Sequence, residues 1–592
     1  MNWDLSKLYP GFDAPEFAAD MGLLRNKIDK VSAQVAALRH GEGEAQALAD
    51  VVRELQSLAA LETRVGHFVF LTLAADANNE AARAWQEKLM LLSIDTEQLN
   101  SALATFMGGV EDIDALCAAE PILAEHRYML VLSKREAAHV IDPALEPTVL
   151  RMQMTGGSAW EQLRDQLDAN HMIEFEQDGE KKLLPLSAIR GLAYSPDAAV
   201  RKAAYEAEIA AYPRMEIPMA ACLNGIKGEA LTMIGLRHYD TVLDTALDNA
   251  RVDRETLDAM LSAMRESLPA FRRYFRLKAK LLGYEGGLKF YDLFAPVGEA
   301  TREYTLEEGR ALLQEIMGRF SKKMSDFIGN AFDDHWIDAY PREGKQGGAF
   351  CAGVHPLGIS YVLSNFDGSL GSVSTLAHEL GHAYHNNCMK DESILMADYP
   401  MPLAETASIF NETLFVNKLL ERADDAEKIT LLDQQIGDAA QVIVDILSRF
   451  IFESEMIERR KDHACSPREL KEIMLDAQKQ TYGDGLDENC LHPYMWACKS
   501  HYYSTGLHFY NFPYAFGLLF GLGVFARYLE KGEAFLPEYD QLLRATGFGD
   551  VRDVAATVDI NVADKNFWKS SLAVIEKQID TLEALYLHKK DA

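Results

Sequence analysis

Hydrophobic residues recur with the period of an amphipathic helix along most of the chain. Between residues 14 and 115, apolar positions spaced three and four apart are interleaved with Ala, Glu and Gln, which favour helices. This pattern predicts long helices there, for example at 44–58 and 81–103. It returns in further segments, at 128–170, 197–211, 217–235, 253–282 and 306–330, and from 372 to about 587. The sequence therefore predicts a predominantly all-α protein.

Two segments interrupt the helical pattern. Residues 172–187 alternate apolar and polar side chains about Asp178-Gly179, which predicts a β-hairpin. Residues 337–371 are rich in glycine and enclose a β-like run at 358–364, which predicts a small sheet before the next helix. A soft boundary near residues 190–200 divides the chain into an N-terminal helical lobe, 1–195, and a second domain, 196–592.

The composition is globular and argues against two classes of partner. Of the 592 residues, 48% are hydrophobic, and 90 acidic residues against 59 Lys and Arg give a net charge of −31. Nucleic acids and anionic membrane surfaces both need a basic face on the protein, so we expect neither as a partner. Seven scattered cysteines without a CxxC pair are typical of a reducing compartment. The N-terminus also lacks the pattern of a signal peptide, with no basic segment followed by an apolar stretch.

The longest stretch without Asp, Glu, Lys or Arg runs from Ser500 to Ala526. Its continuous apolar part, Phe512 to Phe525, is shorter than the ~18–20 residues that a membrane span needs. Asn511 and Pro513 suit the start of a helix there. We therefore interpret the stretch as buried protein interior.

A metal-binding pattern, H-E-x-x-H, lies at His378-Glu379-Leu-Gly-His382 on a predicted helix. The two histidines lie about 40° apart on one helix face, one turn from each other, where they can hold one Zn²⁺. Glu379 is rotated by about 100° from His378, which puts its carboxylate beside the metal, where a base for a water molecule belongs. A solvated helix with two histidines is the alternative. The glycine-rich loop and strand before the motif argue for the metal, because such a strand can lay an extended substrate beside it.

A catalytic zinc has three protein ligands and one open position, and three residues compete for the third place. His385 shares the motif's face but lies a turn beyond His382, which favours a role in the core or behind a ligand. Cys388 falls about 80° off that face in a helix with no break, and we reject it. Glu405 lies 23 residues beyond His382, a spacing that lets a second helix return its carboxylate to the metal; the alternative is an ordinary exposed glutamate. Glu412, seven residues on, can accept the N–H of a ligand histidine.

These residues carry a family resemblance. The set His378-Glu379-Leu-Gly-His382, then Glu405-Thr-Ala-Ser-Ile-Phe-Asn-Glu412, then Phe509-Tyr510-Asn-Phe-Pro-Tyr514-Ala-Phe-Gly resembles the thimet oligopeptidase and oligoendopeptidase F family of zinc metallopeptidases. The opening Trp3-Asp-Leu-Ser-Lys-Leu-Tyr9 resembles the oligoendopeptidase F branch. The likeness implies a two-lobed, mostly helical body around a deep channel with one zinc per chain. It also implies cytoplasmic hydrolysis of short, unstructured oligopeptides by the domain 196–592.

The resemblance and the mechanism together nominate further residues. Peptide hydrolysis by metal-activated water with Glu379 as general base develops an oxyanion that needs a hydrogen-bond donor. Tyr510 and Tyr514 resemble the family's substrate-contacting tyrosines, and Tyr514 is the candidate donor. His501 is the histidine that matches the family better, with His508 as the fallback.

Other functions fit parts of the same pattern. A zinc carboxypeptidase or an amidase would use the same metal site on a different bond. An inactive helical binding scaffold is the alternative from another class, but a scaffold has no use for Glu379 beside an intact ligand set. The sequence leaves cleavage preference, peptide length limits, physiological substrate and oligomeric state open.

Overall fold

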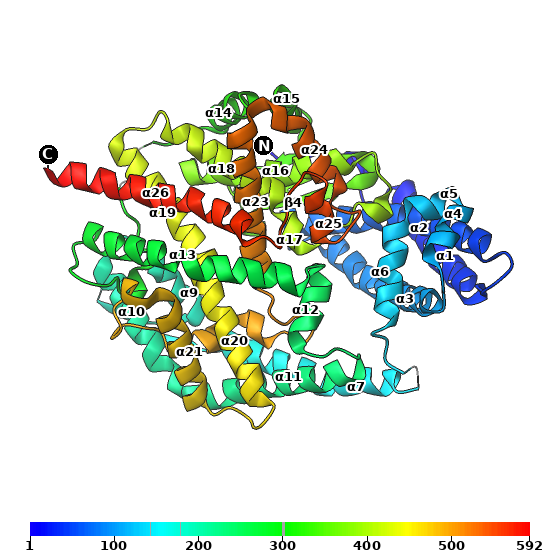
Figure 1. Cartoon of the computed structure of the whole chain (residues 1–592), viewed down its shortest axis with the longest axis horizontal. Coiled ribbons are helices and arrows are strands. Elements are labelled where there is room, and N and C mark those ends of the chain that lie inside the picture. Colours follow the sequence, from blue (N-terminus) through cyan, green and yellow to red (C-terminus); the bar gives the residue numbers. More distant parts are fainter. Residues whose placement is uncertain (143, 178, 299–301, 592) are drawn as a thin grey trace. The chain divides into compact units, whose positions relative to one another are not determined.

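The computed structural model describes residues 1–592 of the chain except 143, 178, 299–301 and 592. The described residues form mostly helices, with one two-stranded and one three-stranded sheet (Figure 1). The predicted all-α class with a small sheet is therefore confirmed. Long helices dominate because the apolar stripes of the sequence have helical spacing and each needs a partner to cover it.

The described chain forms two compact units, and each combines three separate stretches of sequence. The first unit consists of Met1–Val140, Arg302–Lys418 and Arg527–Ile560, and the second of Ile141–Thr301, Leu419–Ala526 and Asn561–Ala592. Residue 195 falls inside the second unit. The division of the chain at that residue into a helical lobe and a catalytic domain stays a prediction.

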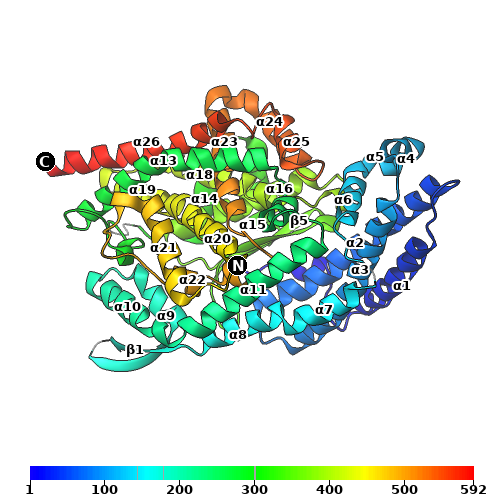
Figure 2. The same ribbon diagram turned by 60° about the horizontal axis from the view of Figure 1, so that its bottom comes forward.

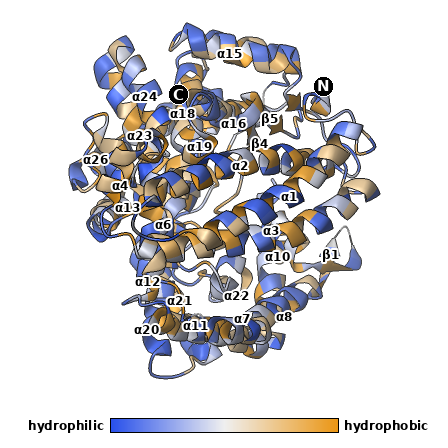
Figure 3. Ribbon diagram, turned by 90° about the vertical axis from the view of Figure 1, so that its right-hand side faces the viewer, coloured by the Kyte–Doolittle hydropathy of each residue, from blue (hydrophilic) through white to orange (hydrophobic). Residues whose placement is uncertain are grey.

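The first unit begins with long helices that pack against one another, α1 (Pro15–Ala37), α2 (Glu44–Ala75) and α3 (Glu80–Gly108). Each buries an apolar stripe, and polar and apolar residues alternate along them in Figure 3. Their core reaches the three-stranded sheet at Tyr361, whose hydroxyl donates to the Asp4 carbonyl at 2.7 Å. Further helices of this unit are α4 (Ile113–Ala119), α5 (Pro121–Glu125), α6 (Arg127–Ala137), α17 (Met401–Ala404), α18 (Thr406–Leu420), α24 (Leu536–Ala545) and α25 (Val551–Ala556).

The sheet of the first unit has the strand order β3-β5-β4. β5 (Ile359–Leu363) is the run that the sequence predicts; β3 (Ile337–Asp338) pairs with it in parallel and β4 (Phe350–Val354) antiparallel. β3 and β4 were not expected, because a two-residue strand and a five-residue strand containing a glycine give little periodic signal. Helix α16 (Leu370–Met389), which carries the H-E-x-x-H motif, packs against β4 and β5.

The second unit contains the predicted hairpin, β1 (Met172–Gln177) and β2 (Glu180–Pro185), which pair antiparallel; Asp178 lies outside the described residues. α13 (Arg254–Leu281) and α26 (Lys565–Asp591), far apart in sequence, pack side by side (Figures 1 and 2). The remaining helices of the second unit are α7 (Glu146–Thr155), α8 (Gly157–Ala169), α9 (Leu186–Gly191), α10 (Ala198–Ala211), α11 (Glu216–Leu236), α12 (Val242–Ala250), α19 (Asp425–Ala440), α20 (Ile446–Arg460), α21 (Pro467–Tyr482) and α22 (Met495–Cys498).

Helix boundaries follow local capping signals. The predicted cap at Asp197 is confirmed, because its carboxylate accepts from the Ala199 N–H at 2.8 Å before α10. The predicted helix at 306–330 is wrong in one respect, since it is two helices, α14 (Leu306–Gly318) and α15 (Lys322–Asp333). The break lies at Ser321, whose hydroxyl accepts from the Met324 N–H and so caps the start of α15.

The uncharged stretch ends in α23 (Phe512–Lys531), of which it supplies the residues up to Ala526. Every residue from Phe512 to Phe525 except Tyr514 and Leu518 is buried, which confirms the prediction of protein interior for this part. For the start of the stretch the prediction is wrong, because Ser500, Gly506 and Leu507 are exposed, Leu507 by 42%. Two segments, Glu44–Ala75 and Phe512–Ala545, are long and apolar enough to cross a membrane by length and composition alone. Core helices pass the same test, so this is weak evidence for a span.

Candidate active site

Helix α16 presents the two motif histidines on one face. It begins after Ser369, whose hydroxyl accepts from the Ser372 N–H at 3.1 Å. The rings of His378 and His382 lie 5.0 Å apart between centroids and are 24% and 18% exposed. The one-turn spacing thus gives two adjacent imidazoles that solvent reaches.

Helix α18 lies unusually close to α16 at Gly381. A Cβ added to Gly381 would lie 2.6 Å from both the Ala407 carbonyl oxygen and the Ser408 Cα. Only glycine therefore allows this approach. The close contact brings Glu405, the residue before α18, to the motif histidines.

The carboxylate of Glu405 contacts both histidines. Its Oε2 lies 3.2 Å from His378 Nε2 and 3.5 Å from His382 Nε2, and one ligand atom from each of the three residues lies within 4.8 Å of the others. Ligands of a tetrahedral zinc with bonds of 2.0–2.1 Å are about 3.3 Å apart. These three residues therefore fit a zinc ion, and no other group of three His, Cys, Asp or Glu in the described part of the chain does so.

Two hydrogen bonds orient the candidate ligands. His378 Nδ1 lies 3.1 Å from Glu412 Oε2, so its other ring nitrogen is directed at the metal position. The buried Ser408 hydroxyl donates to Glu405 Oε2 at 2.7 Å. Sequence reasoning identified Glu412 but missed Ser408, because a serine three residues after a glutamate is too common to be a signal.

Electrostatic coupling across the group is strong. Burial acts to lower the pKa of His378, but hydrogen bonds to Glu405 and Glu412 outweigh it and raise the pKa to about 10. Burial acts to raise the pKa of Glu405, but His378 and His382 lower it to about 2. For His382 burial dominates and lowers the pKa to about 4. At neutral pH His378 therefore carries a positive charge beside the Glu405 carboxylate while His382 is neutral, and a metal cation at the same position would replace that charge.

Glu379 follows His378 on α16 and is only 6% exposed. Burial raises the pKa of its carboxyl to about 7, with a further contribution from the negative charge of Glu405. A carboxylate with a pKa near neutral can both take up and release a proton at physiological pH.

The two other residues that competed for the third ligand place, His385 and Cys388, have partners elsewhere. His385 is fully buried, lies 2.9 Å from Thr546 Oγ1 through Nε2, and stacks on the Tyr399 ring with centroids 4.2 Å apart. Among the described residues no hydrogen bond joins it to the ligand group, which favours the core alternative over a role behind a ligand. Cys388 Sγ lies 3.8 Å from Asp540 Oδ1, away from the group.

The predicted tyrosines and histidine form a cluster in the second unit. The Tyr514 hydroxyl donates to the Tyr510 hydroxyl at 3.2 Å, and the Tyr510 ring stacks on His501 with centroids 5.3 Å apart. His508 instead points into a buried ion pair, with Nδ1 3.2 Å from Lys227 Nζ. The contacts therefore favour His501 over His508 as the companion of the tyrosines.

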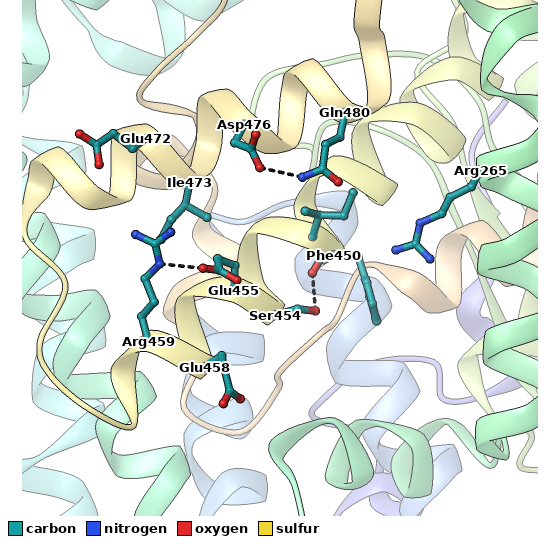
Figure 4. A pocket seen from close by; sticks show the side chains of 11 residues that line it. Arg265, Phe450, Ser454, Glu455, Glu458, Arg459, Glu472, Ile473, Asp476 and Gln480 are labelled. Atoms are coloured by element: carbon teal, nitrogen blue, oxygen red, sulfur yellow. Dashed lines mark hydrogen bonds and ion pairs between the residues drawn. The ribbon is translucent and has the colours of Figure 1, made fainter.

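A cleft of about 710 Å³ also lies in the second unit (Figure 4). Charged residues of α20 and α21 dominate its lining, and the apolar part includes Phe450, whose ring packs against that of Phe509 with centroids 5.2 Å apart. Its carboxylates have local partners, such as Glu455 with Arg459 at 2.7 Å. Sequence reasoning did not identify this cleft, because its lining comes from three helices.

Solved structures share this fold. A chain from Chlamydophila abortus superposes with a TM-score of 0.84 at 22% identity, covering 99% of this chain and 98% of that one. Oligoendopeptidase-F from Enterococcus faecium gives a TM-score of 0.70 at 18% identity, covering 97% and 99%.

Sequence comparisons give the family. Oligoendopeptidase F (chromosomal) of Lactococcus lactis subsp. cremoris is 28% identical over 425 residues, which are 71% of this chain and 70% of that protein. Group B oligopeptidase PepB of Streptococcus agalactiae is 24% identical over 452 residues, 76% and 74% of the two chains. Residues 191–573 match Peptidase family M3, and the predicted resemblance is confirmed. The chain therefore belongs to peptidase family M3.

Proposed function

We propose that the protein is a zinc-dependent metalloendopeptidase that hydrolyses short, unstructured oligopeptides in the cytoplasm. Membership of a peptidase family gives the reaction class. The observation that carries the metal is the convergence of His378, His382 and Glu405 beside the buried carboxylate of Glu379.

His378, His382 and Glu405 would hold one zinc per chain. The bound metal supplies a Lewis acid that makes water nucleophilic near neutral pH. Glu412 fixes the ring of His378, and Ser408 fixes the carboxylate of Glu405, so that the ligands need little rearrangement on binding.

Glu379 acts as the general base. Its carboxylate takes a proton from the attacking water and then passes it to the leaving amine. Burial in the protein supports this role, because it keeps the pKa of the carboxyl near neutrality.

The edge strand β4 supports an extended substrate. β4 lies at the end of the order β3-β5-β4, so one row of its backbone N–H and C=O groups faces away from the sheet. A peptide can pair with such an edge in extended form, whatever its sequence. Folded proteins do not present a free strand, which favours short, unstructured peptides as substrates.

Tyr514 would donate to the oxyanion, with Tyr510 and His501 as its companions. A phenol stays protonated at neutral pH, so it can donate to negative charge that develops in the transition state. The Tyr514 hydroxyl has one proton, so in this role it would turn from the Tyr510 hydroxyl, 3.2 Å away, to the oxyanion and accept the Tyr510 proton in return. The stacking of Tyr510 on His501 supports a shared role of the three residues.

Zinc analysis combined with a peptidase assay tests the proposal. We expect about one zinc per chain and loss of peptide cleavage on chelation, with recovery when zinc is added back. The substrate is an internally quenched fluorescent peptide with a blocked C-terminus, which a carboxypeptidase does not cleave. Full activity after complete metal removal would contradict the proposal. Activity only on peptides with a free C-terminus would favour the carboxypeptidase alternative.

A further inference from the structure

Two buried ion pairs of the second unit hold the loop that carries the candidate tyrosines. We propose that Glu453 with Lys227, and Asp445 with Arg449, are positioning residues that set the tyrosine loop (residues 508–514) for turnover. The inference rests on the proposed function, because it assigns these charges to the transition-state role of Tyr510 and Tyr514.

The three charges on the helical segment form one stripe. Asp445, Arg449 and Glu453 are spaced four residues apart, so they lie along one helix face. Asp445 ends a π-helical turn, Gln441–Asp445, which leads directly into α20. π-Turns inside helices are frequently found at functional sites. The stripe is buried, since Asp445 and Glu453 are 5% and 2% exposed.

The first ion pair binds the start of the tyrosine loop. Glu453 Oε1 accepts from Lys227 Nζ at 2.6 Å and from the backbone N–H of Phe509 at 3.2 Å. Lys227 Nζ also lies 3.2 Å from His508 Nδ1. Two consecutive loop residues, His508 and Phe509, are therefore fixed by one buried pair immediately before Tyr510.

The second ion pair binds the other side of Tyr510. Arg449 donates through Nη1 to the Asn511 side-chain oxygen at 2.9 Å, and its Nη2 pairs with Asp445. Asn511 is the last residue before α23, whose first turn contains Tyr514. Tyr510 is thus held between two anchored neighbours, and Tyr514 follows from the anchored start of the helix.

The loop backbone is strained at the point that Glu453 holds. Phe509 has φ of +51°, a left-handed conformation that is unfavourable for a bulky L-residue. Such strain persists only where surrounding contacts determine the conformation, and it is typical of functional sites. Here the contacts are the Glu453 carboxylate on the N–H and the Phe450 ring against the Phe509 ring.

Buried ion pairs are a poor way to gain stability alone, because the loss of hydration offsets most of their attraction. The same unit contains a matched pair that has no contact with the tyrosine loop. Lys278 Nζ lies 3.0 Å from Asp433 Oδ2, and these two side chains are about as buried as those of Lys227 and Glu453. The Tyr274 hydroxyl also donates to the Asp433 carboxylate. This pair joins α13 to α19 and provides a control for the general effect of removing buried charge.

The test uses paired substitutions, so that no charge is left buried without a partner. Lys227→Met with Glu453→Met removes both charges and the acceptor of the Phe509 N–H. Lys227→Met with Glu453→Gln removes both charges but keeps an oxygen for that N–H. Lys278→Met with Asp433→Asn is the matched control. Each protein is measured for kcat, KM, zinc content and thermal stability with a quenched peptide.

We expect the Met/Met variant to lose about 10²-fold in kcat, the usual consequence of a misplacement near 1 Å, with zinc content unchanged and KM altered by less than about threefold. The Met/Gln variant should recover most of the loss, and the Lys278/Asp433 control should stay near wild type. Adding Tyr514→Phe to the Met/Met variant should lower kcat no further than Tyr514→Phe alone, because both changes remove the same contribution of Tyr514 to turnover. Asn511→Ala, which removes only the Arg449 contact to the loop, should also lower kcat. It tests the same inference if the Met/Met variant does not fold.

A Met/Met variant, or Asn511→Ala in its place, with no greater loss of kcat than the control would overturn the inference while leaving the proposed function intact. The inference would also be overturned if the combination of Tyr514→Phe with the Met/Met variant lost kcat by the product of the two separate losses. Such a result would mean that the ion pair and Tyr514 act independently. A wild-type protein without zinc-dependent peptidase activity would contradict the proposed function itself, and the inference with it.

Discussion

Gly381→Ala tests whether the contact between α16 and α18 sets the geometry of the metal site. The added Cβ would meet the Ala407 carbonyl oxygen and the Ser408 Cα at 2.6 Å, whereas ordinary contact begins at 3.4 Å. Both atoms belong to the backbone and cannot rotate away. The two helices must therefore separate by about 0.8 Å, and overpacking of this kind costs about 1–3 kcal/mol.

The separation acts directly on the ligand group. Glu405 and Glu412 move with α18, while His378 and His382 stay on α16, so the Glu405 contacts of 3.2 and 3.5 Å lengthen. Metal–ligand distances tolerate deviations of only about 0.2 Å. We therefore expect Gly381→Ala to weaken zinc binding by about 10–100-fold, the range seen when the groups that orient ligands are disturbed.

Competition with a chromophoric chelator measures the zinc affinity, and thermal unfolding measures the stability of the same samples. Gly66→Ala is the control, because Gly66 lies inside α2 of the same unit with no atom within 4 Å of an added Cβ. It should be neutral or stabilising by about 0.4–1 kcal/mol. Wild-type zinc affinity in Gly381→Ala would refute the argument that the close approach of the helices builds the site.

Three further predictions address the chemistry and the folded state. Glu379→Gln should keep zinc but lower kcat by about 10²–10⁴-fold, as measured by metal analysis and peptide cleavage, and near-normal turnover would remove Glu379 from the mechanism. Tyr514→Phe should lower kcat by about 10²–10³-fold with KM nearly unchanged, whereas a rise in KM alone would mean that Tyr514 only binds substrate. Burial acts to raise the pKa of Glu208, but His492 and Arg190 lower it from 4.5 to about 2, so its contribution to stability is complete above pH 4.5 and is lost as the pH falls through 2. Glu208→Gln should remove on the order of 3 kcal/mol of the change in unfolding free energy between these two pH values, as measured by unfolding curves. An unchanged pH dependence in the variant would contradict the lowered pKa of Glu208.

The residues of the candidate metal site could be predicted because their signals are local. His378 and His382 lie one turn apart, and the segment with Glu405 and Glu412 follows along the chain after the short helix α17. The structure adds what makes this return possible, the glycine at 381 against the backbone of α18. The sequence shows a small residue there but not the helix that approaches it.

Other features could not be predicted because they depend on contacts between distant segments. Lys227 and Glu453 are 226 residues apart, and each alone is an ordinary charged residue of a helix. β4 becomes a strand only because β5 offers it a partner, since its five residues carry no alternation. The compact units likewise combine stretches that no composition change in the sequence separates.

The zinc content of Glu405→Ala tests the central claim most directly, because Glu405 is the ligand that the fold rather than the motif supplies. Wild-type protein and the variant are purified in parallel and their metal content is compared with peptidase activity and thermal unfolding. The account predicts about one zinc per wild-type chain, little or none in the variant, and no peptide cleavage by the variant. Full zinc occupancy and activity in a folded Glu405→Ala protein would contradict the proposed ligand set and make His385 the next candidate.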